Sequence, residues 1–469
     1  MSHEMIFDLC VVGAGPGGYV AAVRAAEHGM KVVVIDSRQT PGGVCLHEGC
    51  IPSKALLDSS ELYQQVRDKA AKHGVVVTSV GLDLHAMMTR KNEVVQRLSE
   101  GISFLFKKQK VTSIQGTVTG ILKAAHGFDV LISDTSLQSI SAAKVVLATG
   151  SRPIELPMAP FDGKRIVSST EALALAEVPT HLVVVGGGYI GLEMGSVWRR
   201  LGAAVTVVEA LPRIIANSDT SMSATIQRSL KKQGMVIKTS TRLESVEVLS
   251  DGIRVTTSFN DTREVMDCDC LLVAVGRKPN TEGLGLSALG VEINPQGRIV
   301  VDSAYQTTVE GLYALGDIVP GPMLAHKASE EALVCIERMA GNDLPALEYQ
   351  LIPGIVYTWP EGASVGVTEE QLKASGRGYR KGVSNVIANG RAKAMDENDG
   401  QVVVLADERS GEILGVHIVA PRASEMIAEV VTAMRFKATV QDIGFMFHAH
   451  PSLSEVVKEA ALQAVNGEK

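Results

Sequence analysis

Two cysteines, Cys45 and Cys50, stand five positions apart in a glycine-rich segment. In a regular α-helix their side chains would diverge, whereas a disulfide needs Cα atoms about 4.4–6.8 Å apart. Gly49 permits an irregular turn and Pro52 cannot donate to the Glu48 carbonyl, so the backbone has room to bend. Spacing alone leaves a redox disulfide, two ordinary buried thiols or half of a metal site open. The second ligand pair that zinc would need is not evident, so no metal is expected.

A second reactive group lies near the C-terminus, in the run His448-Ala449-His450-Pro451-Ser452-Leu453-Ser454-Glu455. A carboxylate five positions after His450 can fix the tautomer of the imidazole and raise its basicity, which is typical of an acid–base pair. The same run also fits a helix start, with Ser452 or Ser454 as the N-cap and Glu455 in the first turn. Both interpretations stay open at this point.

Two glycine motifs each follow an apolar, strand-like run: Gly13-Ala14-Gly15-Pro16-Gly17-Gly18 and Gly186-Gly187-Gly188-Tyr189-Ile190-Gly191. In both, an acidic residue that ends a second strand, Asp36 or Glu209, comes 23 positions after the first glycine. Such glycines let the backbone approach a pyrophosphate at a helix N-terminus, and the carboxylate accepts ribose hydroxyls. The chain is therefore expected to bind two dinucleotides, or one dinucleotide and one mononucleotide.

Composition narrows the class of protein. Hydrophobic residues make up 45% of the 469 residues and aromatic residues 4%, and glycine occurs 45 times, which favours an α/β protein. A net charge of −7 without a basic tract argues against nucleic acid as a partner. We see neither a signal peptide nor an apolar run of about eighteen residues, so we expect a cytoplasmic protein without a membrane span. Cys10, Cys268, Cys270 and Cys335 lie in apolar or strand-like runs typical of a core.

Together, a redox-active cysteine pair, two nucleotide sites and a histidine–glutamate pair fit one reaction class. Electrons would pass between a dithiol and a two-electron hydride carrier, with a flavin between them. A base is needed because the dithiol loses its protons as it is oxidised, which gives the histidine a role.

The sequence resembles the dihydrolipoamide dehydrogenases of the pyridine nucleotide–disulfide oxidoreductase family over essentially the whole chain. Three motifs carry the resemblance: Gly42-Gly43-x-Cys45-Leu46-x-x-Gly49-Cys50-Ile51-Pro52-Ser53-Lys54, Gly186-Gly187-Gly188-Tyr189-Ile190-Gly191-Leu192-Glu193-x-Gly195-Ser196-Val197-Trp198, and His448-Ala449-His450-Pro451-x-Leu453-Ser454-Glu455. It implies oxidation of protein-bound dihydrolipoamide with reduction of NAD⁺. Lipoyl domains of 2-oxoacid dehydrogenase or glycine-cleavage complexes would be the partners.

The resemblance also assigns roles to residues. Cys45 would be the outer thiol, Cys50 the inner thiol facing the flavin, and His450 and Glu455 would act on the disulfide of the other subunit of a homodimer. Lys54 is expected near the flavin ring, paired with Glu193. The implied FAD site comprises Gly13, Gly15, Gly18, Asp36, Gly43, Lys54, Gly116, Thr149, Gly150, Ser151, Asp317 and Ala325. The implied NAD site comprises Gly186, Gly188, Ile190, Gly191, Glu193, Glu209, Gly276 and Arg277.

The expected fold is α/β, with two Rossmann-like dinucleotide-binding domains followed by a C-terminal α+β dimerisation domain. Residues 1–150 would form the first part of the FAD-binding domain and residues 151–280 the NAD-binding domain. Residues 281–346 would complete the FAD-binding part, and residues 347–469 would form the interface domain of antiparallel sheet and helices.

Several positions depart from the family pattern. Val44 and His47 stand where threonine and asparagine are usual, and His47 is either a modifier of the thiolate pKa or a solvated loop residue. Asp36 replaces the more usual glutamate and should still reach the ribose. Gly362 stands where a branched residue is common, from which we expect looser local packing.

Other functions remain to be weighed. Glu209 favours NAD over NADP, because a carboxylate binds the ribose diol and repels a 2′-phosphate. Mercuric reductases add a C-terminal cysteine pair, which residues 463–469 lack, and glutathione-type reductases usually carry basic residues after the second strand. Two alternatives stay open: a subunit that binds both nucleotides mainly to assemble a complex, and a paralogue that acts on another disulfide or on a quinone. The intact cysteines, histidine and glutamate favour an enzyme.

Overall fold

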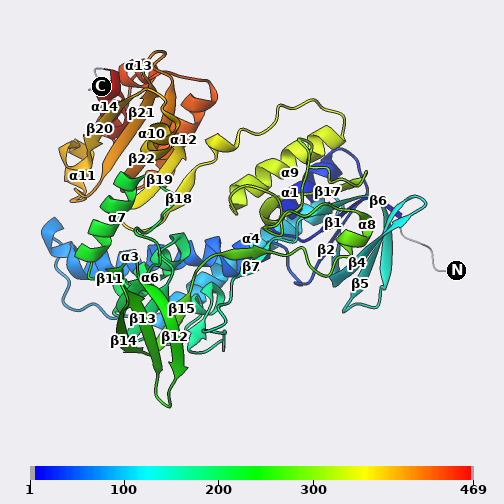
Figure 1. Ribbon diagram of the computed structural model, residues 1–469, viewed down its shortest axis with the longest axis horizontal. Coiled ribbons are helices and arrows are strands. Elements are labelled where there is room, and N and C mark those ends of the chain that lie inside the picture. Colours follow the sequence, from blue (N-terminus) through cyan, green and yellow to red (C-terminus); the bar gives the residue numbers. More distant parts are fainter. Residues whose placement is uncertain (1–5, 466–469) are drawn as a thin grey trace. The chain divides into compact units, whose positions relative to one another are not determined.

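The computed structural model describes residues 6–465, which divide into two compact units (Figure 1). The first unit comprises the chain as far as Ala55 together with Ala86–Ile154 and Arg277–Leu347. The second comprises Leu56–His85, Glu155–Gly276 and the chain from Glu348 onward. The N-terminal residues on which the signal-peptide expectation rests, and the last four residues of the cysteine-free tail, lie outside the described residues.

A seven-stranded sheet forms the centre of the first unit, in the order β3-β2-β1-β6-β5-β4 with β17 also paired to β6. The pairs β3–β2, β2–β1, β1–β6 and β6–β17 are parallel, whereas β5 and β4 join antiparallel. The strands β1, β2 and β17 and the last three residues of β6 (145–147) are almost entirely buried, because helices cover parallel sheets and leave room only for apolar residues. The bounds are β1 (Ile6–Val12), β2 (Val32–Asp36), β3 (Thr112–Gln115), β4 (Thr117–Ala124), β5 (Gly127–Ser133), β6 (Ser139–Leu147) and β17 (Leu312–Ala314).

Two helices of the first unit, α1 (Pro16–Glu27) and α9 (Ala325–Met339), pack against each other (Figure 1). The buried side of α1 is built from small residues such as Ala21, Ala22 and Ala25, which lets the helix approach closely. The first unit also contains α2 (Gly43–Glu48), the start of α3 (Cys50–Asp68), most of α4 (Leu84–Lys108), α8 (Leu286–Leu289) and the strand pair β7 (Ser151–Pro153) with β16 (Arg277–Pro279).

The second unit contains a five-stranded parallel sheet in the order β11-β10-β9-β15-β8. A three-stranded antiparallel sheet, β12-β13-β14, lies between β11 and β15 in the sequence. The bounds are β8 (Ile166–Val167), β9 (His181–Val185), β10 (Ala204–Val208), β11 (Val236–Lys238), β12 (Arg242–Val248), β13 (Ile253–Phe259), β14 (Thr262–Cys268) and β15 (Cys270–Val273), with helices α5 (Ser169–Ala172), α6 (Tyr189–Leu201) and α7 (Thr220–Lys232).

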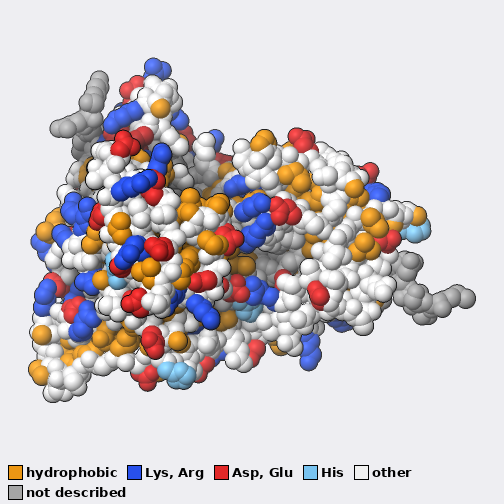
Figure 2. Space-filling model, turned by 60° about the horizontal axis from the view of Figure 1, so that its bottom comes forward, with side chains coloured by type: hydrophobic (Ala, Val, Ile, Leu, Met, Phe, Trp, Pro, Cys, Tyr) orange, Lys and Arg blue, Asp and Glu red, His pale blue; other side chains and the backbone are white. Residues whose placement is uncertain are grey.

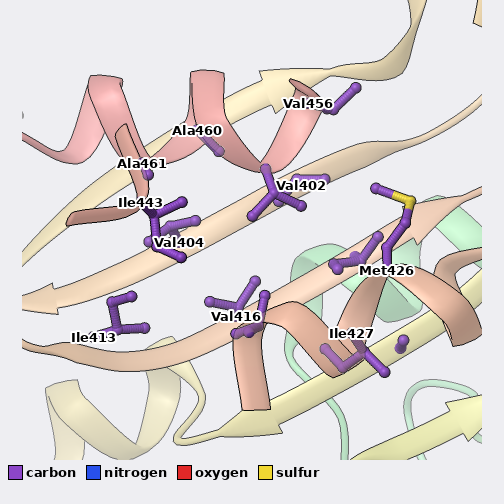
Figure 3. Close-up of a cluster of buried hydrophobic side chains, with 14 of the residues drawn as sticks. Val402, Val404, Ile413, Val416, Met426, Ile427, Ile443, Val456, Ala460 and Ala461 are labelled. Carbon is purple, nitrogen blue, oxygen red and sulfur yellow. The ribbon is translucent and has the colours of Figure 1, made fainter. Parts of the chain in front are cut away.

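The C-terminal part of the second unit is an antiparallel sheet in the order β18-β19-β22-β21-β20, covered by helices. Figure 3 shows its core, where Val402, Val404 and Val416 of the sheet meet Ile427 of α12 and Ala460 of α14. The bounds are β18 (Gly354–Val356), β19 (Glu361–Gly366), β20 (Tyr379–Asn385), β21 (Gln401–Asp407), β22 (Ile413–Ala420), α10 (Glu369–Ser375), α11 (Gly390–Ala394), α12 (Ala423–Arg435), α13 (Val440–Phe445) and α14 (Glu455–Val465). The expected fold class, with its antiparallel C-terminal α+β part, is confirmed.

The expectation of loose packing at Gly362 is wrong. A Cβ atom at this position would lie 2.5 Å from the methyl carbon of Met222 and 2.6 Å from Cδ1 of Ile226. Both side chains come from α7 and occupy the volume that a branched residue would fill, so the glycine marks close packing.

The surface shows no separation of charge on the face seen in Figure 2, where basic and acidic side chains are interspersed. Among residues 6–465, no helix has both the length and the apolar character needed to cross a bilayer.

Candidate active site

The cysteine pair spans a break between two helices. Cys45 lies in α2, and Cys50 is the first residue of α3. Gly49 joins the helices with φ −142° and ψ −116°, and a Cβ there would come 2.9 Å from the Val44 carbonyl oxygen. The irregular turn expected at this glycine is confirmed, and its close approach to the backbone of α2 brings the two thiols together.

The two thiols differ in their surroundings. Cys45 is half-buried, Cys50 is exposed, and both are free thiols in this structure. Hydrogen bonding to Cys50, followed by burial, raises the pKa of the Cys45 thiol far above its ordinary value, against a weaker opposing effect of the Lys54 ammonium. Cys45 therefore holds its proton more firmly than a thiol in water does. No cluster of three or more potential metal-ligating side chains gathers in the described residues.

Two residues between the cysteines, His47 and Glu48, bind the loop that precedes α2. Glu48 forms an ion pair with Arg38 at 2.7 Å, and the half-buried His47 places Nε2 3.2 Å from the carbonyl oxygens of both Thr40 and Pro41. The Nε2–H therefore donates to this loop. His47 is thus half-buried and hydrogen-bonded rather than a solvated loop residue, and its effect on the thiols stays a prediction.

The first glycine motif has the geometry of a nucleotide cradle. A Cβ on Gly18 would lie 1.8 Å from the Gly13 carbonyl oxygen, and one on Gly13 2.4 Å from the Ala148 carbonyl oxygen. A Cβ on Gly15 would meet only Gly43, at 3.9 Å. Close contacts with the backbone therefore require glycine at Gly13 and Gly18. Gly15 has no such contact, and its missing side chain leaves open the space at the N-terminus of α1 that a pyrophosphate needs.

The second glycine motif repeats this geometry. A Cβ on Gly191 would lie 2.1 Å from the Gly186 carbonyl oxygen, and one on Gly186 2.4 Å from the Ala274 carbonyl oxygen. A Cβ on Gly188 would have no atom within 4 Å. Gly188 caps α6 as Gly15 caps α1, so a second pyrophosphate fits here on the same grounds.

The acidic residues of the two motifs make matching contacts. Asp36 accepts hydrogen bonds from the N–H groups of Ala14, at 2.6 Å, and Arg38, at 2.8 Å. Glu209 accepts from those of Gly187, at 2.6 Å, and Leu211, at 2.7 Å. A carboxylate has about four lone-pair sites, so both retain acceptor capacity for a ribose diol. The shorter Asp36 binds its loop as well as Glu209 does.

A polar chain crosses the first unit near the end of β6. The Arg277 Nε–H donates to Ser151 Oγ at 2.7 Å, and the Ser151 hydroxyl donates to an Asp317 carboxylate oxygen at 2.5 Å. Burial lowers the pKa of Arg277, while the charges of Asp317, Cys50 and Glu48 oppose this. Sequence reasoning assigned Arg277 to the NAD site; its guanidinium lies among residues assigned to FAD.

Two supports of this region were missed from the sequence. Asn280 binds the predicted Thr149 twice, since Thr149 Oγ1 donates to the Asn280 carbonyl at 2.6 Å and Asn280 Nδ2 donates to the Thr149 carbonyl at 3.0 Å. Beside Asp317, the buried pair Lys327–Glu331, 2.9 Å apart, braces Gly316 through its carbonyl at 2.8 Å and its N–H at 2.7 Å. The four-residue spacing on α9 is a signal for that pair, although it also fits a surface ion pair.

The C-terminal run forms two histidine–glutamate pairs. His450 Nδ1 lies 2.8 Å from Glu455 in the first turn of α14, and the His450 side chain is 79% exposed. The Ser452 N–H and then His450 lower the pKa of Glu455. His448 is 4% exposed, and its Nε2 lies 2.8 Å from Glu429 of α12, a partner missed from the sequence. The acid–base geometry and the helix start expected from the sequence therefore coexist.

The predicted site residues divide between the units. The first unit holds both cysteines, all residues assigned to FAD, and Arg277. The second holds His450 and Glu455 together with Gly186, Gly188, Ile190, Gly191, Glu193, Glu209 and Gly276. Glu193 is buried on α6 and accepts from the Tyr357 N–H at 3.1 Å. Its pairing with Lys54 stays a prediction.

Comparison with known proteins agrees with this geometry. Residues 7–332 match the family described as pyridine nucleotide-disulphide oxidoreductase, and residues 352–461 match its dimerisation domain. The chain is 46% identical to the mitochondrial dihydrolipoyl dehydrogenase of Pisum sativum, with 97% of this chain and 91% of that protein covered. It is 45% identical to dihydrolipoyl dehydrogenase 3 of Pseudomonas putida, with 97% of each covered. The crystal structure of LpdA from Mycobacterium tuberculosis gives a TM-score of 0.89 at 28% identity, covering 97% of this chain and 99% of that one. The chain therefore belongs to the pyridine nucleotide-disulphide oxidoreductase family, whose members use FAD and NAD.

Proposed function

We propose that this protein is a dihydrolipoamide dehydrogenase. It oxidises the dithiol of dihydrolipoamide to the disulfide of lipoamide and reduces NAD⁺ to NADH, with release of one proton. The observation that carries the proposal is near-full-length similarity to dihydrolipoyl dehydrogenases, combined with a cysteine turn and a histidine–glutamate pair of the right chemistry.

The cysteine turn would carry the thiol–disulfide exchange. In the oxidised enzyme, a substrate thiolate attacks the Cys45 sulfur of the Cys45–Cys50 disulfide and releases Cys50 as a thiolate. The second substrate thiol then attacks its own half of the mixed disulfide and releases Cys45. Because the pKa of Cys45 is raised, Cys45 is a poor leaving group as a thiolate and must take up a proton as it departs. Bound FAD supplies the two-electron relay from this dithiol to NAD⁺.

His450 would handle the protons. Its Nδ1–H donates to Glu455, so Nε2 is the basic nitrogen, and it belongs to a side chain that is 79% exposed. It takes a proton from the substrate thiol as that thiol attacks, and returns one to Cys45 as Cys45 departs. Glu455, whose pKa is lowered, stays ionised and stabilises the imidazolium.

A homodimer accounts for the exposure of this base. We place His450 and Glu455 at the cysteine pair of the partner subunit, which the match of residues 352–461 to a dimerisation domain supports. The proposed domains are FAD-binding residues 1–150 and 281–346, NAD-binding residues 151–280 and interface residues 347–469. Lipoyl domains of 2-oxoacid dehydrogenase or glycine-cleavage complexes would deliver the substrate.

The nucleotides would divide between the two glycine motifs. The first motif would hold FAD, with Asp36 binding the adenosine ribose and with Lys54 and Cys50 as the residues expected beside the flavin. NAD binds the second, where Glu209 selects against a 2′-phosphate. The open space beside Gly15 and Gly188 supports both placements.

An anaerobic titration of the purified holoenzyme with dihydrolipoamide tests the proposal. We expect a long-wavelength absorbance band that NAD⁺ then removes, and we expect Cys50→Ser to lose the band. His450→Gln should keep the flavin and slow band formation by about a hundredfold or more, within the usual contribution of general acid–base catalysis. A flavin that NADH reduces but dihydrolipoamide does not would move the assignment to another disulfide or a quinone.

A further inference from the structure

A buried ion pair lies behind the segment that carries Asp317. Its members, Lys327 and Glu331, stand four positions apart on α9, and their side chains are 1% and 0% exposed. The Lys327 ammonium and one carboxylate oxygen of Glu331 lie 2.9 Å apart. Both side chains are enclosed by the fold of one subunit, so their contacts do not depend on what covers its surface.

The buried pair holds both polar groups of the Gly316 backbone. Lys327 Nζ donates to the Gly316 carbonyl at 2.8 Å, and the other carboxylate oxygen of Glu331 accepts from the Gly316 N–H at 2.7 Å. Gly316 has φ +78°, and a Cβ there would lie 3.3 Å from the Cβ of Ala328. The residue before Asp317 is therefore fixed against α9 in a conformation that favours glycine.

The Asp317 carboxylate has two neighbours that hold it in one place. It accepts a hydrogen bond from the Ser151 hydroxyl at 2.5 Å. Burial lowers the pKa of Lys327, whereas the negative charges of Glu331 and then Asp317 oppose this effect. Asp317 therefore lies within electrostatic reach of a buried cation as well as next to a hydrogen-bond donor.

The chain that follows Asp317 is also fastened, as far as the start of α9. Arg298 Nη1 donates to the carbonyl oxygens of Val319, at 3.3 Å, and of Gly321. A few residues later α9 begins at Ala325, which is assigned to FAD together with Asp317. The buried pair on α9 thus ties one of these two segments directly to the other.

An ion pair in the interior is a weak source of stability. Taking two charges out of water costs free energy that their attraction often does no more than offset, and apolar residues of similar volume usually serve as well. Apolar residues could not, however, bond the N–H and the carbonyl of Gly316 at the same time. These two hydrogen bonds give the buried charges a use that packing alone does not.

We propose that Lys327 and Glu331 are positioning residues for FAD, which fix Gly316 and thereby aim the carboxylate of Asp317 at the cofactor. An ionised carboxylate only accepts hydrogen bonds, so its direction decides which hydroxyl groups of a ligand it can bind. The inference rests on the placement of FAD under the proposed function and deepens it. Neither member of the pair has accessible surface with which to touch a ligand, so both act through Asp317.

Release of FAD from the holoenzyme tests this role without turnover. Lys327→Met removes the donor to the Gly316 carbonyl and leaves Glu331 uncompensated. We expect release, followed as a rise in flavin fluorescence after dilution, to become about ten- to a hundredfold faster. The neutral double variant Lys327→Gln/Glu331→Gln should also release FAD faster, and it replaces the single variant if an unpaired buried charge prevents folding.

A control variant separates this effect from general destabilisation. Val130→Ala removes buried methyl groups from β5 of the same unit, far along the chain from the buried pair, and should lower the urea midpoint measured by circular dichroism. Its FAD release should stay within about twofold of the wild type. If release accelerates equally in Val130→Ala and Lys327→Met, the pair is merely structural and the inference fails.

A double-mutant cycle then tests the route through Asp317. Asparagine keeps one acceptor oxygen, so Asp317→Asn should retain enough FAD for the measurement while releasing it faster than the wild type. Adding Lys327→Met to Asp317→Asn should change release by less than about twofold, although the urea midpoint still falls. Equal acceleration by Lys327→Met in both backgrounds, or none in the wild-type background, would overturn the inference.

The proposed function fails on different readouts. Release from Asp317→Asn that is as slow as from the wild type would contradict the placement of FAD at Asp317, and with it the inference. A holoenzyme that ignores dihydrolipoamide, but loses FAD through Lys327→Met as expected, would contradict the proposed substrate alone.

Discussion

The two glycine motifs of this chain are nearly identical in themselves and differ in what surrounds them. Both have the same spacing, the same two close approaches of glycine to carbonyl oxygen, and a carboxylate that binds two loop N–H groups. In the first, however, Gly43 packs directly on the motif: a Cβ on Gly43 would lie 2.5 Å from the Gly15 Cα. No atom would contact a Cβ on Gly188 in the second.

The packing of Gly43 links the first glycine motif to the cysteine pair. Gly43 is the first residue of α2, which carries Cys45, so the cysteine turn is built onto the first motif. A nucleotide held there would be fixed relative to the thiols, which suits the proposed place of the flavin. The loop after Glu209 also binds its motif, since the Ile215 N–H donates to the Gly187 carbonyl at 2.8 Å. Among the described residues, however, no atom would lie within 4 Å of a Cβ on Gly188, and this open space suits a coenzyme that enters and leaves in each cycle.

Alanine at the last glycine of each motif should give the largest effects. Gly18→Ala forces a Cβ to within 1.8 Å of a carbonyl oxygen, and Gly191→Ala to within 2.1 Å. With each loop displaced at a cost of about 3 kcal/mol or more, Gly18→Ala should lose most of its FAD and all turnover. Gly191→Ala should keep FAD and its reduction by dihydrolipoamide, while NADH formation falls at least about a hundredfold. Flavin content after gel filtration measures FAD retention, and anaerobic stopped-flow absorbance measures flavin reduction and NADH formation. Similar flavin loss in the two variants would remove the distinction between the motifs.

Substitution of Gly43, which packs on the first motif, should give the next largest effect, with Gly188 as the matched control. Gly43→Ala introduces both a clash with Gly15 and a side chain at φ +61°, so we expect about 2–3 kcal/mol of destabilisation. This loss of stability would be measured by urea unfolding, with flavin release as the signal. Gly188→Ala should leave the midpoint of unfolding unchanged, because open space surrounds its Cβ, yet raise the KM for NAD⁺ about tenfold where the pyrophosphate must fit. A normal KM in Gly188→Ala would mean that the space is not used by the coenzyme.

The paired carboxylates should give moderate effects. Glu209→Ala leaves the N–H groups of Gly187 and Leu211 without their acceptor and removes the ribose contact, at a cost of about 1.5–3 kcal/mol. The KM for NAD⁺ should rise about ten- to a hundredfold, and discrimination against NADP⁺ should weaken. Asp36→Ala should leave the KM for NAD⁺ unchanged and instead weaken FAD retention, measured by dialysis. Glu209→Asp tests whether the shorter acid serves the second motif as Asp36 serves the first.

Much of this architecture could be predicted from the sequence because its signals are local. The last glycine of each motif, Gly49 between the cysteines, and Glu455 after His450 all contact residues about five positions away. Spacing therefore encodes their geometry. Residues whose partners lie far away in the sequence were missed, among them Asn280 with Thr149 and Glu429 with His448. Gly362 was misjudged for the same reason, since the side chains that fill its space belong to α7.

Side-chain direction was equally hidden from the sequence. Arg277 follows a strand that ends in glycine, as expected, but pattern alone could not show its guanidinium bound to Ser151. Lys327 and Glu331 have the spacing of an ordinary surface pair, yet both are buried and brace the Gly316 backbone. Burial of charge depends on the packing of α9 against the rest of the unit, which only the folded structure supplies.

The smallest expected effect concerns His47 of α2, the helix that packs on the first motif through Gly43. His47→Asn removes the Nε2–H that donates to the Thr40 and Pro41 carbonyls, because the shorter amide does not reach them. The loss should be about 0.5–1.5 kcal/mol of stability, seen as a lower urea midpoint for flavin release. His126→Asn, at an exposed position, controls for the change of residue type. Since the hydrogen bonds of His47 go to backbone carbonyls of the loop, the pH profile of turnover should stay as in the wild type. A shifted pH profile would instead make this histidine part of the thiolate chemistry, and the first motif would then differ from the second in electrostatics as well as in packing.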